Sequence, residues 1–375
     1  MGELKEKERM EKEAYYYWLD TVPGIGRLTM KRILEKTDPK EVYEQGTGLI
    51  EGILKEGQKK AIEEFRQKKD PYKEWIKIKE KGIRLLFPKD QQFPQKLKDI
   101  PDPPTALYIK GKAEYLRTPT AAVVGARNCS AYGALAAKEL GRELAERGIT
   151  VVSGLARGID GISQWAALEG GGVSVGVLGS GVEICYPPEN RPLYERLQKE
   201  GCLLSESSPH TGPRAGLFPL RNRLISGWAD VVVVMEAKEK SGTLITVDMA
   251  LEQGKEVYAM PGRITDSLST GCNRLIGQGA GVLLSPREFA GQMAAQLGLD
   301  KKEEKKEEET EMTAEEKIIY QLLEPLPMSV EEILQKAKAD GPGLTPGQVM
   351  EGLMNLVMAG RACTHEQYFY RKHFG

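Results

Sequence analysis

Short runs of apolar and β-branched residues, each followed by glycine and then by a helical pattern, recur from residue 83 to about residue 297. This alternation is typical of a parallel α/β sheet, in which a helix follows each strand. Several runs are apolar on successive residues, as expected for strands covered by helices on both faces. The pattern predicts strands at residues 121–125, 150–154, 173–179, 202–205, 231–236 and 256–260.

The region before this sheet has helical periodicity instead. Apolar residues at helical spacing run from about Ala14 to Lys69 and are interrupted by Val22-Pro23-Gly24-Ile25-Gly26. Two glycines around an isoleucine, between two helical runs, are the pattern of a helix-hairpin-helix. The glycines either expose backbone amides to a phosphate or only turn the chain between packed helices. One short motif leaves both interpretations open.

The region after the sheet begins with lysine and glutamate and then becomes helical again. Helical patterns at residues 318–323, 330–337 and 349–358 lead into a β-like end at 362–370, which together suggest a winged helix. The charged stretch has no apolar face and is typical of a solvated linker. We therefore predict a helix-hairpin-helix or SAM-like module at 1–80, a Rossmann-like, mostly parallel sheet domain at 81–298, a linker at 299–316 and a winged helix at 317–375.

Composition narrows the class of protein. The chain has 375 residues, of which 40% are hydrophobic and 29% charged, so it can bury the cores of two or three domains. Its first residues are charged and no apolar stretch is long enough to span a bilayer, so we expect a cytoplasmic protein with no membrane partner. The five cysteines lack CxxC spacing and lie away from the three histidines, which predicts reduced thiols and no metal.

The formal net charge of −1 argues against a protein that coats nucleic acid by bulk electrostatics. The charge is uneven, however. The segment from Lys301 to Glu316 contributes −4 and leaves the remainder near +3. Any nucleic-acid site must therefore be local.

Ligands of open parallel sheets bind beyond the carboxyl ends of the strands. Glycine lets a backbone approach a ligand, and serine or threonine at a helix start leaves amides exposed, so turns with these residues suit an anion. Such turns hold Gly125 and Arg127; Ser153, Gly154 and Arg157; Gly179; and Ser241, Gly242 and Thr243. Each glycine alone could serve only a tight turn. Their convergence on one edge favours a phosphorylated ligand, and the missing GxGxxG argues against a dinucleotide cofactor.

The segment from Ser205 to Arg223 adds positive charge to the same edge. Arg214 lies in a loop and is free to reach a phosphate, whereas Phe218 either stacks on a base or anchors the loop. Arg221 and Arg223, which flank Asn222, cannot both face one ligand if they are helical, because residues two apart point in different directions.

These segments closely resemble the DNA-processing protein A (DprA/Smf) family of bacteria. The resemblance is carried by Phe93-Pro94, Asp102-Pro103-Pro104, Val124-Gly125-Ala126-Arg127, Ser153-Gly154-Leu155-Ala156-Arg157-Gly158-Ile159-Asp160, Tyr186-Pro187, Phe218-Pro219-Leu220-Arg221-Asn222-Arg223, Ser241-Gly242-Thr243-Leu244-Ile245-Thr246 and Met260-Pro261-Gly262. Family membership implies a non-catalytic protein without cofactor that binds single-stranded DNA and dimerises through its Rossmann-like domain. It also implies delivery of the strand to the RecA recombinase during natural transformation. Arg127, the turn at Ser153–Arg157 and the loop around Arg214 are the positions similar to family DNA contacts.

The sequence departs from the family pattern in two places. Ser163-Gln164 stands where the family often has Ala-His, so any role for that histidine is absent. Ala126 stands where serine is common, which removes one hydroxyl but leaves the adjacent glycine and arginine.

Two other functions remain as alternatives. A nucleotide phosphoribohydrolase of the lysine-decarboxylase-like family needs a glutamate where this chain has Thr246, although Glu206 and Glu236 lie near the right strand ends. A winged-helix regulator of duplex DNA needs a basic recognition helix, and residues 346–358 contain neither lysine nor arginine.

Overall fold

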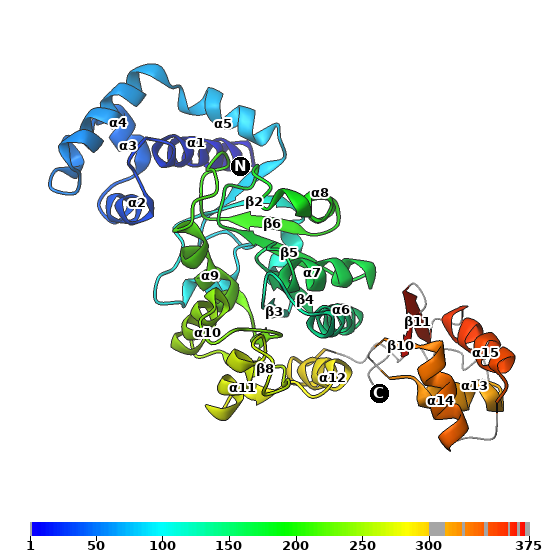
Figure 1. Cartoon of the computed structure of the whole chain (residues 1–375). Helices are drawn as coiled ribbons and strands as arrows, with labels where there is room; N and C mark the ends of the chain where they lie inside the picture. Colours follow the sequence, from blue (N-terminus) through cyan, green and yellow to red (C-terminus); the bar gives the residue numbers. More distant parts are fainter. Residues whose placement is uncertain are drawn as a thin grey trace.

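The computed structural model describes residues 2–299, 312–324, 327–340, 344–358, 361–365 and 368–371. Its centre is a nine-stranded sheet in the order β1-β2-β6-β5-β4-β3-β7-β8-β9 (Figure 1). The strands are β1 Ile83–Leu86, β2 Leu107–Gly111, β3 Thr120–Val124, β4 Thr150–Ser153, β5 Ser174–Leu178, β6 Cys202–Ser205, β7 Val231–Val234, β8 Glu256–Ala259 and β9 Gly281–Val282. The six predicted strands are confirmed to within two residues at each end, while β1, β2 and β9 were not predicted.

The sheet is mostly parallel, as expected. Strands β3 to β9 pair in parallel, and only β1 with β2 and β2 with β6 pair antiparallel. The chain runs outward from β3 through β4 and β5 to β6, then returns to place β7 on the other side of β3. The strand order therefore reverses between β3 and β7, which is the point where open α/β sheets hold their ligands.

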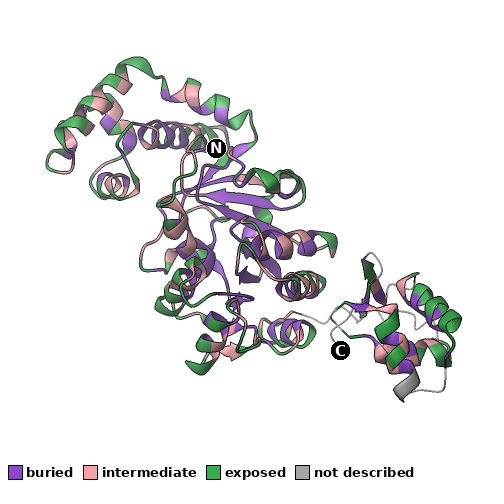
Figure 2. Cartoon of the chain, viewed as in Figure 1, coloured by how far each residue is buried: buried purple, intermediate pink, exposed green. Residues whose placement is uncertain are grey.

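Helices cover both faces of this sheet. They are α6 Ala131–Glu146, α7 Ile159–Glu169, α8 Arg191–Glu200, α9 Leu217–Trp228, α10 Gly242–Glu252, α11 Thr270–Gly277 and α12 Pro286–Gln296. Val231 and Val233 of β7 pack with α6 and α12, whereas Val232 and Val234 pack with α9, α10 and α11. All four valines are at most 1% exposed, so the strand is apolar at every position because both of its faces are buried (Figure 2).

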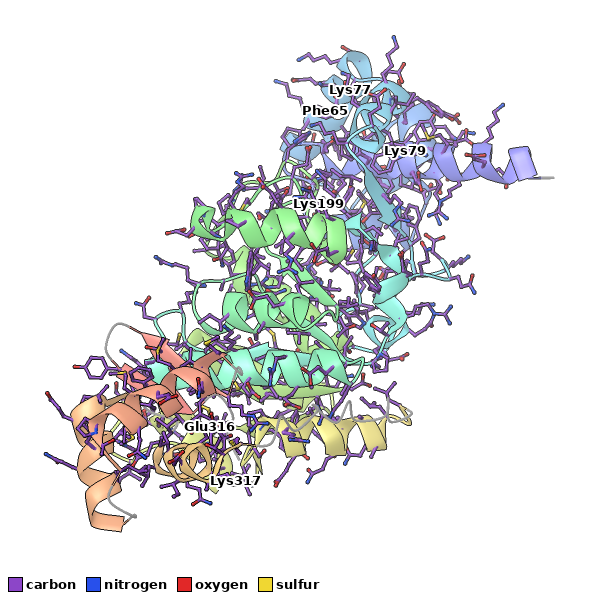
Figure 3. All side chains as sticks on the ribbon, turned by 90° about the vertical axis from the view of Figure 1, so that its right-hand side faces the viewer. Phe65, Lys77, Lys79, Lys199, Glu316 and Lys317 are labelled. Atoms are coloured by element: carbon purple, nitrogen blue, oxygen red, sulfur yellow. The ribbon has the colours of Figure 1, made fainter. Side chains whose placement is uncertain are left out.

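The N-terminal module consists of five helices. They are α1 Gly2–Asp20, α2 Arg27–Leu34, α3 Pro39–Gln45, α4 Glu56–Lys68 and α5 Pro71–Lys79, and short 3-10 turns in the chain lie at Thr47–Ile50, Gln95–Lys98, Ala113–Arg117 and Pro188–Asn190. Trp18 and Trp75 of the module share one hydrophobic cluster with Ile83, Leu85 and Tyr108 of β1 and β2. The boundary predicted at residue 80 falls between α5 and β1, but the core continues across it. Figure 3 labels Phe65, Lys77 and Lys79 in the module, which lies beside the part of the sheet domain that carries α8 and Lys199.

The hairpin between α1 and α2 uses its glycines unequally. Gly24 has a φ of +85°, which favours glycine, whereas Gly26 has a φ of −102° that any residue adopts. The Gln58 side-chain amide donates to the Gly24 carbonyl at 2.7 Å, so the turn is tied to α4. This contact accounts for a turning role of the motif, and phosphate binding by its amides stays a prediction.

The C-terminal region has its own core. Its described elements are α13 Ala314–Leu322, β10 Met328–Ser329, α14 Val330–Asp340, α15 Pro346–Met358, β11 Ala362–His365 and β12 Tyr368–Arg371. The strands form an antiparallel sheet in the order β10-β12-β11. Three helices and a hairpin occur in the predicted order, and the assignment as a winged helix stays a prediction.

The predicted linker at 299–316 is shorter at its C-terminal end than expected. Helix α13 begins at Ala314, where Thr313 and Glu316 form a capping box, so the last residues of the predicted linker are helical. Residues 300–311 of the linker lie outside the described residues. Among the residues that the structure describes, no helix combines the length and apolarity that a bilayer crossing requires.

Candidate functional site

The crevice between β3 and β7 is filled by a side chain of the protein itself. Glu236, which follows β7 and is 1% exposed, accepts a hydrogen bond from the Ser130 amide at 2.9 Å and another from the Ser130 hydroxyl. A Cβ atom on Gly133 would lie 2.3 Å from the Glu236 carboxyl carbon. The carboxylate therefore occupies the N-terminus of α6, where the pyrophosphate of a dinucleotide would bind. This geometry agrees with the absence of GxGxxG.

The turn after β4 is built around Arg221 of α9. The Arg221 guanidinium donates to the carbonyls of Gly154, at 3.0 Å, and Val177, and a Cβ atom on Gly154 would lie 2.5 Å from its nitrogen. The Ser153 hydroxyl donates to the Val123 carbonyl at 2.6 Å. Ser153, Gly154 and Arg221 are all buried, so their side-chain contacts serve the packing of the strand ends.

Burial also changes the charges beneath this turn. Desolvation lowers the pKa of Arg221 to about 10, although the carboxylate of Asp160 favours its charged form. Burial likewise raises the pKa of Asp160, and the Arg221 charge opposes that shift. Arg127 contributes to the lowered pKa of Arg221, so the two cations lie close enough to interact. Two arginines, one buried and one exposed, therefore lie near each other at these strand ends.

Two side-chain amides, the half-buried Asn190 and the buried Gln164, hold the backbone of the same turn. Leu155 has a φ of +55°, which is strained for a bulky residue. The Asn190 side-chain amide donates to the carbonyls of Leu155 and Ala156 at 3.0 and 2.9 Å. The Leu155 amide donates to the Gln164 side chain at 3.0 Å, and Gln164 donates in turn to Ser174 and Val175. The residue that replaces the family histidine is thus a buried support of the turn.

Three side chains remain accessible above these buried groups. The Arg127 guanidinium carbon lies 5.9 Å from the centre of the Phe218 ring, within the range of a cation–π contact. The Phe218 ring lies 5.4 Å from the ring of Tyr186, at an angle of 32°. Arg127 is exposed, Tyr186 is 40% exposed and Phe218 is half-buried. A cation and two aromatic rings thus form one accessible surface at the ends of β3 and β5.

Other predicted residues surround this surface. Arg157 is exposed and its guanidinium lies 3.7 Å from the carboxylate of Glu189, a pair more than half exposed on both sides. Arg214 is exposed in the loop that precedes α9. Ser241 caps α10 by accepting from the Thr243 amide at 3.2 Å, next to the exposed Gly242. The N-terminus of α10 therefore stays accessible, unlike that of α6.

Arg223 points away from Arg221, as the helical spacing predicted. It is buried against Glu206, at 2.5 Å, and Asp102, at 3.2 Å. Arg27 of the N-terminal module joins the same cluster through an ion pair with Asp102. Arg223 therefore links α9 to the loop of Asp102 and to the module. Asn222, between the two arginines, accepts a hydrogen bond from Arg221 Nε at 3.2 Å.

The predicted residues thus separate into two groups. Arg127, Arg157, Arg214, Phe218, Gly242 and the capped start of α10 are accessible or partly accessible, whereas Ser153, Gly154, Gly179, Arg221 and Arg223 are buried. Gly179 packs closely against Phe218, since a Cβ atom at this position would lie 3.0 Å from the Phe218 ring. The sequence prediction omitted Tyr186 from the site. Tyr186 was noted only as part of the family motif Tyr186-Pro187, and its place in a loop after a strand was the one further signal.

The residues named for the alternative phosphoribohydrolase function are buried or already paired within the protein. Thr246 is buried on α10, Glu206 is paired with Arg223, and Glu236 is bonded to Ser130. Within the described ranges, no three His, Cys, Asp or Glu side chains lie close enough together to hold a metal ion.

Comparisons with known proteins agree with this architecture. The sequence model of the family described as DNA recombination-mediator protein A matches residues 84–294. DNA processing protein DprA of Bacillus subtilis (strain 168) is 42% identical over 212 residues, which are 56% of this chain and 71% of that protein. The X-ray structure of DNA processing protein A from Streptococcus pneumoniae matches with a TM-score of 0.63 at 31% identity, and covers 74% of this chain and 97% of that one.

A second solved structure is that of DNA processing protein A from Helicobacter pylori, studied for its single-stranded DNA binding mode. It matches with a TM-score of 0.53 at 29% identity, over 57% of this chain and 96% of that one. The resemblance and the fold class inferred from the sequence are confirmed by these matches. The matching description names a recombination mediator and not an enzyme, in agreement with the expected non-catalytic role. On its sequence and its fold, the chain belongs to the DNA recombination-mediator protein A family.

Proposed function

We propose that this chain binds single-stranded DNA along the carboxyl ends of β3, β4 and β5. The observation that carries the proposal is the contact of Arg127 with Phe218 and of Phe218 with Tyr186, at 5.9 and 5.4 Å. Aromatic faces stack on unpaired bases whatever their sequence, and a neighbouring arginine neutralises the backbone phosphate. In duplex DNA the bases are already stacked on each other, so this surface favours a single strand.

The accessible and the buried residues have different tasks in this proposal. Arg127, Arg157 and Arg214 contact phosphates, Phe218 and Tyr186 stack on bases, and the turn from Ser241 to Thr243 offers backbone amides. Gly125, Ser153, Gly154, Gly179, Arg221, Asn222 and Arg223 shape the edge that presents them. Because the net charge is −1, affinity depends on this local cluster rather than on the whole surface.

The relatives support the same function. The Helicobacter pylori protein, which shares this fold at 29% identity, is described as binding single-stranded DNA. The family description as a recombination mediator is consistent with a protein that passes the strand to a recombinase. We propose RecA as that recombinase and natural transformation as the process, as the family resemblance implied.

We further propose that the protein is a homodimer formed through its Rossmann-like domain. Strand β9 lies at the end of the sheet, and the neighbouring apolar side chains Ile264, Val282 and Leu284 are 89%, 39% and 80% exposed. An unpaired strand edge next to exposed apolar side chains is a surface that a second copy can cover.

The direct test is a comparison of single-stranded and duplex oligonucleotides of equal length in a fluorescence anisotropy titration of the full chain. We expect tighter binding of the single strand, with no dependence on a divalent metal. Equal or tighter binding of the duplex would contradict the proposal. Adding RecA and following its DNA-dependent ATP hydrolysis on a strand coated by single-strand-binding protein tests the delivery step. We expect a shorter lag when this chain is present, and an unchanged lag would contradict delivery.

A further inference from the structure

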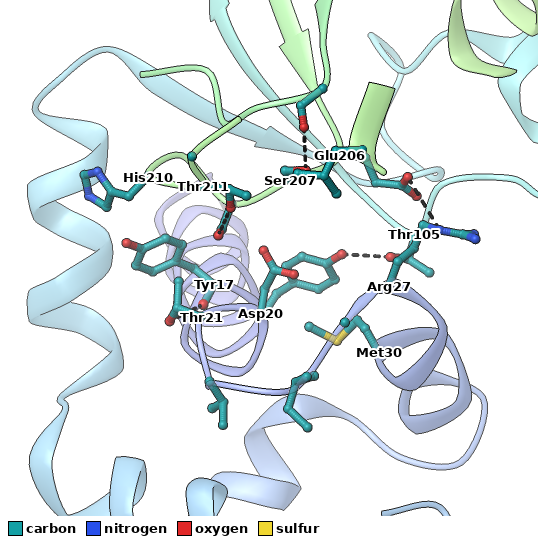
Figure 4. A pocket seen from close by; sticks show the side chains of 18 of the residues that line it. Tyr17, Asp20, Thr21, Arg27, Met30, Thr105, Glu206, Ser207, His210 and Thr211 are labelled. Carbon is teal, nitrogen blue, oxygen red and sulfur yellow. Dashed lines mark hydrogen bonds and ion pairs between the residues drawn. The ribbon is translucent and has the colours of Figure 1, made fainter. Parts of the chain in front are cut away.

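A cavity of about 580 Å³ lies between the N-terminal module and the sheet domain (Figure 4). The module contributes residues from the end of α1 and the start of α2, and the sheet domain contributes the loop at 206–214 and the first turns of α9. Its volume lies in the range of sites that hold small molecules. None of the sequence patterns pointed to it, because its two walls come from parts of the chain about 180 residues apart.

The wall formed by the module is aromatic and carries the carboxyl groups of Asp20 and Glu74. Asp20 points into the open space next to Tyr17 in Figure 4. The Tyr108 hydroxyl donates to one oxygen of the Asp20 carboxyl at 2.8 Å. The second oxygen accepts no hydrogen bond within the residues that the structure describes. Asp20 therefore offers a free acceptor at an aromatic wall.

The charges around the cavity select which part of a nucleotide can enter it. Three carboxylates line it together with cations such as Lys69 and Arg221. Glu206 is paired with Arg223, and Glu74 with Lys69 and Lys77. Asp20 has no ion pair among the described residues, so a phosphate is disfavoured next to Asp20. Arg27, which also lines it, is already paired with Asp102. Arg214 lines the cavity from the opposite loop and remains available for a phosphate. A base inside and a phosphate at Arg214 is the arrangement that these charges favour.

The cavity adjoins the surface proposed for DNA. Gly179 lines the cavity and also lies next to Phe218, because a Cβ atom on Gly179 would lie 3.0 Å from the Phe218 ring. Leu217, the neighbour of Phe218, lines it as well. A strand stacked on Phe218 would therefore lie next to residues that line the cavity.

We propose that this cavity receives one base of the bound strand and that Asp20 accepts a hydrogen bond from the exocyclic amino group of cytosine, adenine or guanine. This inference rests on the proposed binding of single-stranded DNA. Thymine and uracil have a carbonyl where cytosine has its amino group, and a carbonyl oxygen facing Asp20 is repelled. A hydrogen bond to a charged acceptor is strong enough for a preference of about tenfold.

Oligomers of deoxycytidine and deoxyuridine of equal length test the preference, because they differ at the amino or carbonyl position and both stack weakly. In anisotropy titrations of the full chain at pH 8 we expect the cytidine oligomer to bind about tenfold more tightly. In Asp20→Asn the amide oxygen accepts from Tyr108 and the amide nitrogen faces the cavity as a donor. The preference should then disappear or reverse, while the affinity for the uridine oligomer does not fall.

A second variant tests the cavity without touching Asp20. Gly26 lines the cavity and has an ordinary φ, and a Cβ atom added to it would have no heavy atom within 4 Å, so Gly26→Leu adds an apolar side chain there with room at its Cβ. Gly57 of α4 is exposed and equally unobstructed but does not line the cavity, so Gly57→Leu is the matched control. We expect Gly26→Leu to abolish the cytidine preference and Gly57→Leu to retain it, with both variants melting cooperatively near the parent temperature.

The outcomes separate this inference from the proposed function. If neither oligomer binds, the proposed function fails and the inference with it. If both bind equally tightly, or if the preference survives in Asp20→Asn and Gly26→Leu, the strand is bound but no base enters this cavity, and the inference alone is overturned.

Discussion

The Glu236 carboxylate, just beyond β7, accepts a hydrogen bond from the Ser130 amide at 2.9 Å, and Ser130 is the N-cap residue of α6, the helix that follows β3. The two residues are 106 positions apart in the sequence. Their contact occupies the anion site that a nucleotide-binding relative of the same fold would leave open. We therefore expect any anion site of this chain to lie elsewhere on the edge, at the exposed arginines of the proposed function.

Glu236→Ala tests whether the carboxylate replaces a phosphate. Because it removes a buried charged acceptor, we expect the free energy of unfolding to fall by about 2 kcal/mol. Millimolar inorganic phosphate should then raise the melting temperature of the variant and not that of the parent. Glu236→Gln, which keeps the volume, is the control and should not respond to phosphate. A parent protein that phosphate stabilises as strongly as the variant would contradict the account.

Asp20 makes stability depend on pH. Burial raises the pKa of Asp20 to about 7, above the ordinary aspartate value of 3.8. The folded state therefore holds a proton that the unfolded chain releases, so this group's contribution to stability declines as pH rises from about 4 to about 7 and then levels off. We expect the melting temperature of Asp20→Asn to rise relative to that of the parent between pH 5 and pH 7. Above pH 7.5 the difference between the two melting temperatures should stay constant. A difference that shrinks over this interval would show that the carboxyl is stabilised in its charged form.

Gly154→Ala tests the claim that this glycine makes room for Arg221 and does not approach DNA. The added methyl would lie 2.5 Å from the Arg221 guanidinium, and such overpacking costs about 1–3 kcal/mol of stability. Urea denaturation should show that loss, while the salt dependence of DNA binding stays that of the parent. Gly277→Ala, at an unobstructed glycine of α11, is the control. A variant of full stability with weakened DNA binding would assign Gly154 to the contact surface instead.

The homodimer is tested at the free edge of the sheet. Leu284→Glu places a charge on the surface beside β9, so we expect light scattering to report a monomer at concentrations where the parent is a dimer. Leu251→Glu changes a side chain that is 59% exposed on α10 and should leave the dimer intact. If Leu284→Glu remains dimeric and Leu251→Glu does not, the interface lies on the α10 face.

Local patterns predicted much of the fold. The four valines of β7 are apolar in succession because both faces of the strand are covered, and that pattern is visible without any partner. Strand β1, with only four residues at the antiparallel edge, carries no such signal. The separation of Arg221 from Arg223 followed from helix geometry alone.

The site depended on contacts that the sequence pattern does not carry. Arg221 is buried because its guanidinium meets carbonyls of Gly154 and Val177, which are 67 and 44 positions away. In the sequence, Arg221 and Arg127 were both arginines assigned to the same edge of the sheet. That pattern could not distinguish the buried Arg221 from the exposed Arg127. Tyr186 became a candidate only when the fold placed its ring against Phe218.

The salt dependence of single-strand binding by Arg127→Ala tests the central claim most directly, with Lys199→Ala on the exposed end of α8 as the control. We predict that Arg127→Ala weakens binding to every sequence alike and reduces the slope of log K against log salt by about 0.7, the increment of one phosphate contact on a single strand. Its melting temperature should equal that of the parent, because the exposed guanidinium makes a cation–π contact with Phe218 and no side-chain hydrogen bond or ion pair within the described residues. A parent-like slope together with a lowered melting temperature would contradict the account and make Arg127 a structural residue.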